Sequence, residues 1–348
     1  MSPCALSVVI PCLNGGKHLS EAIESILRQE SDAGSIEIVV VDNCSTDEET
    51  LAILDTWRHH GPSVRVVSHA AKADPGGSRN TGVAASSGAW LAFLDADDVW
   101  LPGGLQARWE VIASHPGVEW VAADFQEWYH DGSVEPTGHY QRQNFLGRLL
   151  APAFRANKPL VLVRPVESFL RTSPAWTGTV LMKRSLFERV GGFPAGLLIA
   201  EDLHLWYRLA VQVDLVFVPR VVALYRQHPA SLIHRSRRGR RLGPEWDKVY
   251  RSLRRDPDLR PWRRQLRKKL AAVYDSQAWD CRAAGDYRGA ARAAIGALSY
   301  VPLRPKSWRS LARDLLLAML GVRSHGPPVP SATPILPSRG GADDHTVA

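Results

Sequence analysis

Short apolar runs rich in β-branched residues alternate with amphipathic segments along the first hundred residues. The apolar runs, each of strand length, are residues 6–10, 36–41, 64–67 and 90–94. The segments with helical spacing of apolar residues are 19–27, 50–57 and 79–86. Strands that alternate with helices predict βαβ units, and therefore an α/β fold with a Rossmann-like, mostly parallel sheet and helices on both faces.

The pattern changes twice further along the chain. Strand-like runs at 118–123, 180–183 and 213–219 are separated by less regular sequence and by a helical segment at 201–210. Residues 244–320 are helical in pattern, with a break near Gly285. We therefore expect an α/β domain at 1–235, a basic helical extension at 236–323, and a disordered tail rich in Pro, Gly and Ser at 324–348.

Composition excludes several classes of protein. The chain has 348 residues, of which 45% are hydrophobic, so it is neither disordered nor collagen-like. Its four cysteines are scattered without metal-ligand spacing, so no structural zinc site is expected. The first apolar stretch is broken by Pro11 and lacks the features of a signal peptide, and no apolar window reaches the length of a membrane span. These features predict a cytoplasmic protein with reduced thiols.

The net charge of +8 is concentrated in one segment, because residues 235–269 hold 15 Lys and Arg against four acidic residues. A solvated helix face, nucleic acid and an anionic membrane surface are the three interpretations. No nucleic-acid-binding motif accompanies the charge, so nucleic acid is not expected as a partner. Trp246, Tyr250 and Trp262 lie among the basic residues, so peripheral contact with the cytoplasmic face of an anionic membrane is the functional hypothesis, and a plain solvated helix face stays its main alternative.

Polar residues follow several of the expected strands. Ligands of parallel α/β sheets bind beyond the carboxyl ends of the strands, where this chain has Pro11 to Asn14, Asp42-Asn43 and Asp95 to Asp98. Three carboxylates within four positions, Asp95, Asp97 and Asp98, repel one another unless a cation lies among them. Mg²⁺ or Mn²⁺ prefers such oxygen ligands. A solvated turn or a helix cap is the alternative.

Other residue groups have both a functional and a structural interpretation. Asp42 and Asn43 can bind a base or a ribose, or form an Asx turn. Arg79 follows a glycine pair and can reach a diphosphate, or lie on the surface. Glu201-Asp202 can supply a general base, or place acids favourably at a helix N-terminus. Arg226 can bind phosphate, and His228 can bind a metal or diphosphate, or be structural.

Seven segments together resemble the inverting family 2 glycosyltransferases of the GT-A fold. They occur in the family's order and approximate spacing at residues 7–14, 41–47, 78–80, 94–98, 191–193, 201–202 and 225–228. The resemblance covers residues 5–235 and implies a nucleotide-binding half at about 1–115 and an acceptor half at 116–235. It implies an enzyme that moves a sugar from a nucleotide-sugar donor to a hydroxyl of a glycan or lipid-linked acceptor, in bacterial-type surface polysaccharide assembly.

The resemblance also implies site residues. Pro11, Asp42 and Asn43 would lie at the donor's base and ribose, with Asn14 in the same loop region, and Arg79 would approach the base or the phosphates. Asp95 and Asp97 would be the DxD pair that holds Mg²⁺ or Mn²⁺, joined by Asp98, and Asp202, beside Glu201, would be the catalytic base. A UDP-sugar is the expected donor, with GDP- and dTDP-sugars as alternatives. Asn43 and Cys44 depart from the pattern, since many relatives have Asp and Gly there.

Two rival functions remain. A sugar nucleotidyltransferase usually has a glycine-rich, basic loop directly after its first strand, whereas this chain has Pro11, Asn14 and a single nearby lysine, Lys17. A non-catalytic carbohydrate- or nucleotide-binding protein would be expected to have lost its acidic residues, which this chain keeps. Acceptor specificity is expected in residues 124–200, where Trp128, Tyr129, Tyr140 and Trp176 can stack on sugars or fill the core.

Overall fold

A computed structural model of the chain describes residues 5–30, 34–227 and 242–320. The described residues up to 227, apart from 170–172, belong to one compact unit, and 170–172 with 242–320 belong to a second. The boundaries between catalytic halves, extension and tail that the sequence suggests remain predictions.

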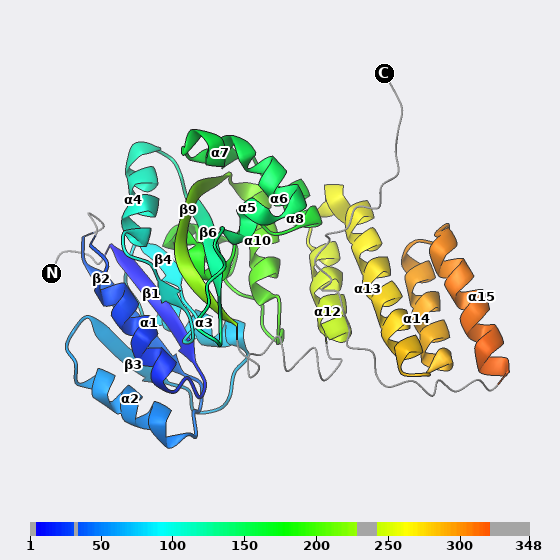
Figure 1. The fold of residues 1–348 in the computed structure, drawn as a ribbon, viewed down its shortest axis with the longest axis horizontal. Helices are drawn as coiled ribbons and strands as arrows, with labels where there is room; N and C mark the ends of the chain where they lie inside the picture. Colours follow the sequence, from blue (N-terminus) through cyan, green and yellow to red (C-terminus); the bar gives the residue numbers. More distant parts are fainter. Residues whose placement is uncertain (1–4, 31–33, 228–241, 321–348) are drawn as a thin grey trace. The chain divides into compact units, whose positions relative to one another are not determined.

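The first unit is built on a nine-stranded sheet with the order β3-β2-β1-β4-β8-β6-β9-β5, and β7 pairs with β9 (Figure 1). The strands are β1 (Leu6–Cys12), β2 (Ile36–Asp42), β3 (Val64–Ser68), β4 (Trp90–Phe93), β5 (Val99–Trp100), β6 (Trp120–Tyr129), β7 (Leu160–Leu162), β8 (Leu181–Lys183) and β9 (Leu215–Gln227).

The first four strands form the parallel half of the sheet. β1 lies between β2 and β4, with β3 outside β2, and all three pairings are parallel. In the other half β6 and β9 are parallel, whereas β8 pairs antiparallel with both β4 and β6, and β5 and β7 pair antiparallel with β9. The predicted mostly parallel, Rossmann-like sheet is confirmed, with a mixed second half.

The helices of the first unit connect and cover these strands. They are α1 (Lys17–Leu27), α2 (Glu48–Arg58), α3 (Pro75–Ala84), α4 (Gly104–Ser114), α5 (His139–Arg142), α6 (Asn144–Leu149), α7 (Ala151–Ala156), α8 (Val166–Arg171), α9 (Arg184–Arg189) and α10 (Glu201–Gln212), with a 3₁₀ turn at Thr177–Thr179. The sequence pattern did not indicate α5 to α8, which are short and interrupted by irregular backbone.

Alternate residues of the parallel strands explain why both faces of the sheet are covered. Val8 and Val40 belong to one core cluster with the apolar side of α1, which includes Ile23. Val9 and Val41 point to the opposite face, where a Cβ at Gly82 of α3 would lie 2.3 Å from Val9 Cγ1. Gly82 thus lets α3 approach the sheet closely.

Pro219 lies inside β9, although the sequence pattern predicts that the strand ends there. A proline cannot donate a ladder hydrogen bond, so a strand interior tolerates it at an edge or a bulge. The register between β6 and β9 shifts around Asp124 and Phe125, opposite this part of β9. The irregularity allows one strand to continue past the proline to Gln227.

The second unit is helical, which confirms the predicted helical C-terminal region. Its helices are α12 (Leu242–Arg255), α13 (Arg263–Ala283), α14 (Tyr287–Tyr300) and α15 (Pro305–Met319), with a 3₁₀ turn at Arg260–Trp262. Gly285, at a φ of 74°, lies in the turn between α13 and α14, where the sequence predicts a break. A second break, near Pro257 and Pro261, was missed, although proline commonly interrupts a helix.

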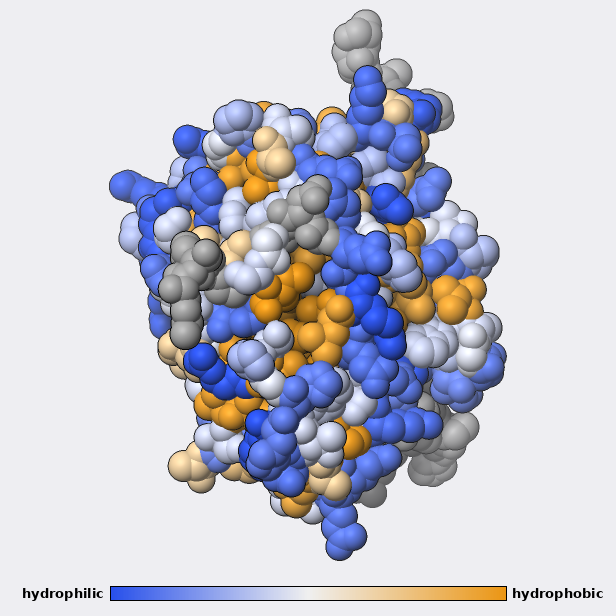
Figure 2. Space-filling model, turned by 90° about the vertical axis from the view of Figure 1, so that its left-hand side faces the viewer, coloured by the Kyte–Doolittle hydropathy of each residue, from blue (hydrophilic) through white to orange (hydrophobic). Residues whose placement is uncertain are grey.

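None of the described helices combines the length and the apolarity that crossing a bilayer requires. Apolar side chains nevertheless reach the surface of the molecule. Figure 2 shows hydrophobic side chains gathered in the middle of one face, within a mostly hydrophilic surround. The exposed large apolar residues of the first unit include Val161, Val163 and Leu198.

Candidate active site

The carboxyl ends of β1, β2 and β4 meet at one edge of the sheet, because these strands are adjacent and parallel. Pro11 lies near the end of β1, in register with Val41 of β2. Asn14 follows in a left-handed conformation with a φ of 55°. Its Oδ1 accepts a hydrogen bond from the Thr46 amide at 2.8 Å, so Asn14 joins the loops after β1 and β2.

Asp42 and Asn43 both take part in local structure. Asp42 Oδ1 accepts from the Ser45 amide at 2.9 Å, which is the Asx turn considered as the alternative. Asn43 is buried, and its amide group makes two hydrogen bonds with the backbone of Ala73, at 2.7 and 2.9 Å. The Asn43 side chain therefore holds the loops after β2 and β3 together, while Asp42 shapes the loop after β2. The contact of these two residues with a base or ribose remains a prediction.

Cys44 stands in the left-handed region with a φ of 62°, a conformation that glycine adopts more readily than cysteine. We expect Cys44→Val to lower the free energy of unfolding by about 1–2 kcal/mol, because a β-branched side chain clashes with left-handed backbone. Cys44→Gly should cost much less. Urea unfolding of both variants measures the difference, and equal stability of the two would contradict the strain.

Arg79 of α3 is buried and joins two acidic parts of the site. Its Nη2 donates to Asp95 Oδ1 at 2.6 Å and its Nη1 donates to Glu201 Oε1 at 2.5 Å. Its guanidinium also lies over the ring of Phe193. Burial alone would lower the pKa of Arg79, but the charges of Asp95 and Glu201 hold that pKa above its usual value. Arg79 thus brings the loop after β4 next to the start of α10.

The acidic turn after β4 contains two partly exposed carboxylates, Asp95 and Asp97, and one buried carboxylate, Asp98. Asp98 Oδ1 accepts from the Arg226 amide at 2.7 Å, and Arg226 Nε donates to the Asp97 carbonyl at 2.8 Å. Burial and the two neighbouring acids raise the pKa of Asp98 well above its usual value. Arg226 of β9 therefore anchors the turn from across the sheet.

Arg226 is held on both of its other sides. Its Nη2 is paired with Glu21 of α1, and its guanidinium lies 3.8 Å above the ring of Trp128. The Arg226 side chain thus has structural partners that the sequence did not indicate. His228, one position beyond the end of β9, lies outside the described residues, so its predicted role is untested.

The turn has the ligand chemistry that a divalent cation needs. Mg²⁺ usually takes one or two carboxylates together with substrate phosphate oxygens, and Asp95 and Asp97 supply partly exposed carboxylates. Asp98 Oδ2 is buried and has no hydrogen-bond partner within the described structure. Among the residues that the structure describes, no three His, Cys, Asp or Glu side chains come together in a group that could hold a metal ion. Any cation at the turn would therefore also need ligands from a substrate.

Asp202 and Glu201 begin α10, after Ala200 in a left-handed conformation with a φ of 58°. The hydroxyl of Thr177 donates to Asp202 Oδ2 at 3.0 Å. Burial raises the pKa of Asp202, although the charge of Arg79 opposes that rise. Strained backbone next to a partly buried carboxylate with a raised pKa is typical of functional sites.

Two other motifs of the resemblance contact each other. Asn80 of α3 makes two hydrogen bonds with the backbone of Phe193, at 2.9 and 3.0 Å. Gly192 has a φ of 68°, and a Cβ there would lie 2.8 Å from Asn80 Oδ1. The Ser78–Asn80 and Gly191–Phe193 segments thus join α3 to the approach to α10.

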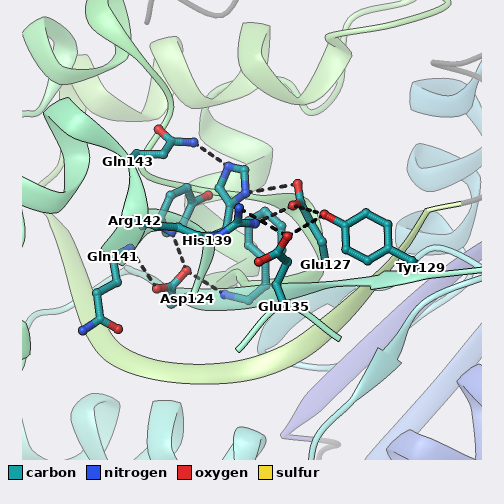
Figure 3. Close-up of polar contacts among 10 residues, drawn as sticks. Asp124, Glu127, Tyr129, Glu135, His139, Gln141, Arg142 and Gln143 are labelled. Carbon is teal, nitrogen blue, oxygen red and sulfur yellow. Dashed lines mark hydrogen bonds and ion pairs between the residues drawn. The ribbon is translucent and has the colours of Figure 1, made fainter. Parts of the chain in front are cut away.

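A second polar cluster lies on β6 and α5, in the part expected to bind the acceptor (Figure 3). Glu127 contacts His139, Arg142 and Tyr129. The contacts with His139 and Arg142 lower the pKa of Glu127 to about 2. The charged and aromatic groups are thus arranged around one carboxylate that stays ionised at neutral pH.

The aromatic residues expected near the acceptor are divided between core and surface. Tyr140 is buried and belongs to the core. Trp176 is partly exposed, and its ring lies 4.5 Å from Phe125 and 5.3 Å from Tyr225, measured between centroids. Trp176 precedes Thr177, the partner of Asp202, so Trp176 is next in the sequence to a residue that contacts the candidate base. A single threonine 25 positions before Asp202 has no recognisable sequence signal, and Thr177 was therefore missed.

The family model "Glycosyl transferase family 2" matches residues 7–190, which is more than half of the chain. The chain belongs to glycosyl transferase family 2. The matched residues of this family 2 chain include the loops after β1, β2 and β4 with Arg79, but they end before Glu201 and Asp202.

Known proteins resemble this family 2 chain in sequence and in fold. Succinoglycan biosynthesis protein ExoO of Rhizobium meliloti is 38% identical over 29% of this chain and 28% of ExoO. Staphylococcus aureus TarS in complex with UDP-GlcNAc is 16% identical, with a TM-score of 0.62 over 91% of this chain and 92% of that one. The mannosyltransferase PcManGT of Pyrobaculum calidifontis, in complex with GDP-Man and Mn²⁺, is 20% identical, with a TM-score of 0.53 over 92% and 88% of the two chains.

The sequence matches cover only part of the relatives, whereas the structural matches cover most of both chains. This chain spans less than two thirds of the length of several curated relatives that it matches, ExoO among them. The structural likenesses extend over both units at low identity, so they show the fold. They confirm the expected GT-A-like architecture.

Proposed function

We propose that the protein is an inverting glycosyltransferase that moves a sugar from a nucleotide-sugar donor to a hydroxyl of a glycan or lipid-linked acceptor. Family membership supports transfer chemistry. The observation that carries the proposal is the contact of Arg79 with both Asp95 and Glu201, which brings the acidic turn beside the candidate base, Asp202.

Asp95 and Asp97 would hold a Mg²⁺ or Mn²⁺ ion together with the donor's diphosphate. Such a cation stabilises negative charge on a departing nucleoside diphosphate. The PcManGT complex, which contains both GDP-Man and Mn²⁺, supports a metal in this fold. Asp98, buried beneath the turn and bonded to Arg226, would keep the two partly exposed carboxylates in place.

Asp202 would accept the proton of the acceptor hydroxyl as that oxygen attacks the anomeric carbon. Its raised pKa makes it a better proton acceptor than a fully solvated aspartate. Thr177 donates to Asp202 Oδ2 and the Leu203 amide donates to Oδ1, so both oxygens of the carboxylate are held at the start of α10. One displacement by the hydroxyl, from the side opposite the leaving group, would invert the configuration.

The proposal also names a donor and a class of acceptor. A UDP-sugar is the first choice, and the UDP-GlcNAc complex of TarS supports it. The succinoglycan pathway named for ExoO supports polysaccharide assembly. A lipid-linked acceptor would bring a cytoplasmic enzyme to the cytoplasmic face of a membrane, which the basic segment at 235–269 also suggests.

A donor screen by thermal shift tests this function. UDP-, GDP- and dTDP-sugars are each added with Mn²⁺, and the donor is expected to raise the melting temperature because it binds only the folded chain. We expect a UDP-sugar to give the largest shift, and to give much less without the metal. No shift with any nucleotide sugar would contradict the proposed function.

A further inference from the structure

Helix α15 places polar side chains at the most buried positions against its own unit. Its buried residues are Ser307 and Asp314. Asp314 Oδ2 accepts from Arg282 Nη1 of α13 at 2.7 Å, and Ser307 Oγ donates to Asp275 Oδ1 of α13 at 2.9 Å. An amphipathic helix usually buries its apolar side against its own domain. In α15 the two fully buried side chains are polar, and several of its large apolar side chains are exposed.

The opposite side of α15 carries large apolar residues in the solvent. Trp308, Leu315, Leu316 and Met319 are 54%, 47%, 56% and 85% exposed. Their spacing of seven, eight and eleven positions after Trp308 places them on one side of the helix. An apolar stripe of this kind is typical of an interaction surface.

A row of basic residues accompanies the apolar stripe. Lys306, Arg309 and Arg313 are exposed. At 100° per residue they fall beside Leu316 on the helix surface, away from the buried side. Arg313 also contacts Asp314 at 3.3 Å. An apolar stripe containing Trp and Leu, flanked by Lys and Arg, is characteristic of helices that lie in the membrane interface.

The basic segment at 235–269 is less suited to this role than its charge suggests. Tyr250, expected among its surface aromatics, is buried. Arg251 is paired with Asp247 at 2.6 Å and with the hydroxyl of Tyr274 at 2.8 Å. Part of the segment therefore stabilises the helical unit itself, so the expectation that Tyr250 contacts a membrane is wrong.

We propose that the exposed side of α15 docks the protein on an anionic membrane surface, with Trp308, Leu316 and Met319 in the interface and the basic row at the lipid phosphates. A second copy of the chain is a poorer occupant, because apposing two such sides would bring Lys306, Arg309 and Arg313 of both copies together. The docking surface contains none of the candidate catalytic residues, so the inference stands independently of the proposed reaction.

Vesicle flotation of the full chain tests the docking surface. We expect binding to phosphatidylcholine vesicles with about 30% phosphatidylglycerol, and little binding to phosphatidylcholine alone, because anionic lipid attracts the basic row. Met319→Glu should lower the bound fraction about fivefold or more, since it puts a charge into the apolar stripe. Val163→Glu is the matched control, because Val163 is 74% exposed and lies in the first unit.

The outcomes separate the possible occupants of this side. Arg309→Gln with Arg313→Gln should weaken binding to the anionic vesicles, and added salt should do the same. Absence of flotation by the unmodified chain, or equal flotation of Met319→Glu, would overturn the proposal. Self-association that Met319→Glu abolishes, without vesicle binding, would assign the surface to a second copy and would overturn it as well.

Discussion

Asp202→Asn is expected to lower the rate of sugar transfer by about a thousandfold, within the range usual for loss of a general base. Asparagine keeps the shape of the side chain and can still accept the hydrogen bond from Thr177, but it cannot take up a proton. Donor binding should stay within about twofold of the unmodified enzyme, because the base acts on the acceptor. Release of nucleoside diphosphate measures the rate, and calorimetry measures donor binding.

The pH dependence adds a second readout for Asp202. The base works only when it is deprotonated, so the rate should fall as the pH decreases through its pKa. Because burial raises that pKa, the fall should begin at a higher pH than for a solvated aspartate. Thr177→Val should change the pH at which the rate falls, because Thr177 donates to Asp202, and should leave residual activity. Near-normal turnover by Asp202→Asn would remove the base assignment.

Arg79→Met is expected to lower the free energy of unfolding by about 3–5 kcal/mol, the usual effect of removing one partner from a buried ion pair. The change leaves the buried carboxylate of Glu201 without its cation and releases Asp95 at the site. The matched control is Arg28→Met, which removes a solvent-exposed arginine from its pair with Glu24 and should cost no more than about 1 kcal/mol. Urea unfolding compares the two variants.

A double variant distinguishes lost charge balance from lost packing. Adding Glu201→Gln to Arg79→Met removes the unpaired buried charge, so it should restore part of the stability. If packing against Phe193 were the main contribution of Arg79, the second substitution would restore nothing. An Arg79→Met variant as stable as Arg28→Met would contradict the buried position of the guanidinium.

The sequence predicted the parallel half of the fold well. The strands at 6–10, 36–41 and 64–67 are short and rich in β-branched residues, and the first two are largely buried, so their pattern is nearly independent of distant contacts. The helices α5 to α8 were not predicted, because they span only four to six residues and owe their structure to neighbours such as Asp124, whose carboxylate accepts the amide of Tyr140.

The sequence indicates which acidic residues lie in the candidate site, but not which side chains pair with one another there. The positions of Asp95, Asp97 and Asp202 follow from strand ends and a helix start, which a sequence shows directly. The pairing of Arg79 with Asp95 and Glu201 depends on how α3, β4 and α10 pack, across a separation of 122 positions for Glu201. Arg79 was expected at a phosphate or base, and its burial beneath two carboxylates became evident only in the folded chain.

Binding of UDP to the chain in the presence and absence of Mn²⁺, measured by calorimetry, tests the central claim most directly. The account predicts metal-dependent binding that Asp97→Asn weakens by about tenfold or more, because one of the carboxylates available to the cation is lost. Asp55→Asn, at an exposed position of α2, should bind as the unmodified chain does. Binding that needs no metal, or that Asp97→Asn leaves unchanged, would contradict the assignment of the acidic turn to a cation and its nucleotide sugar.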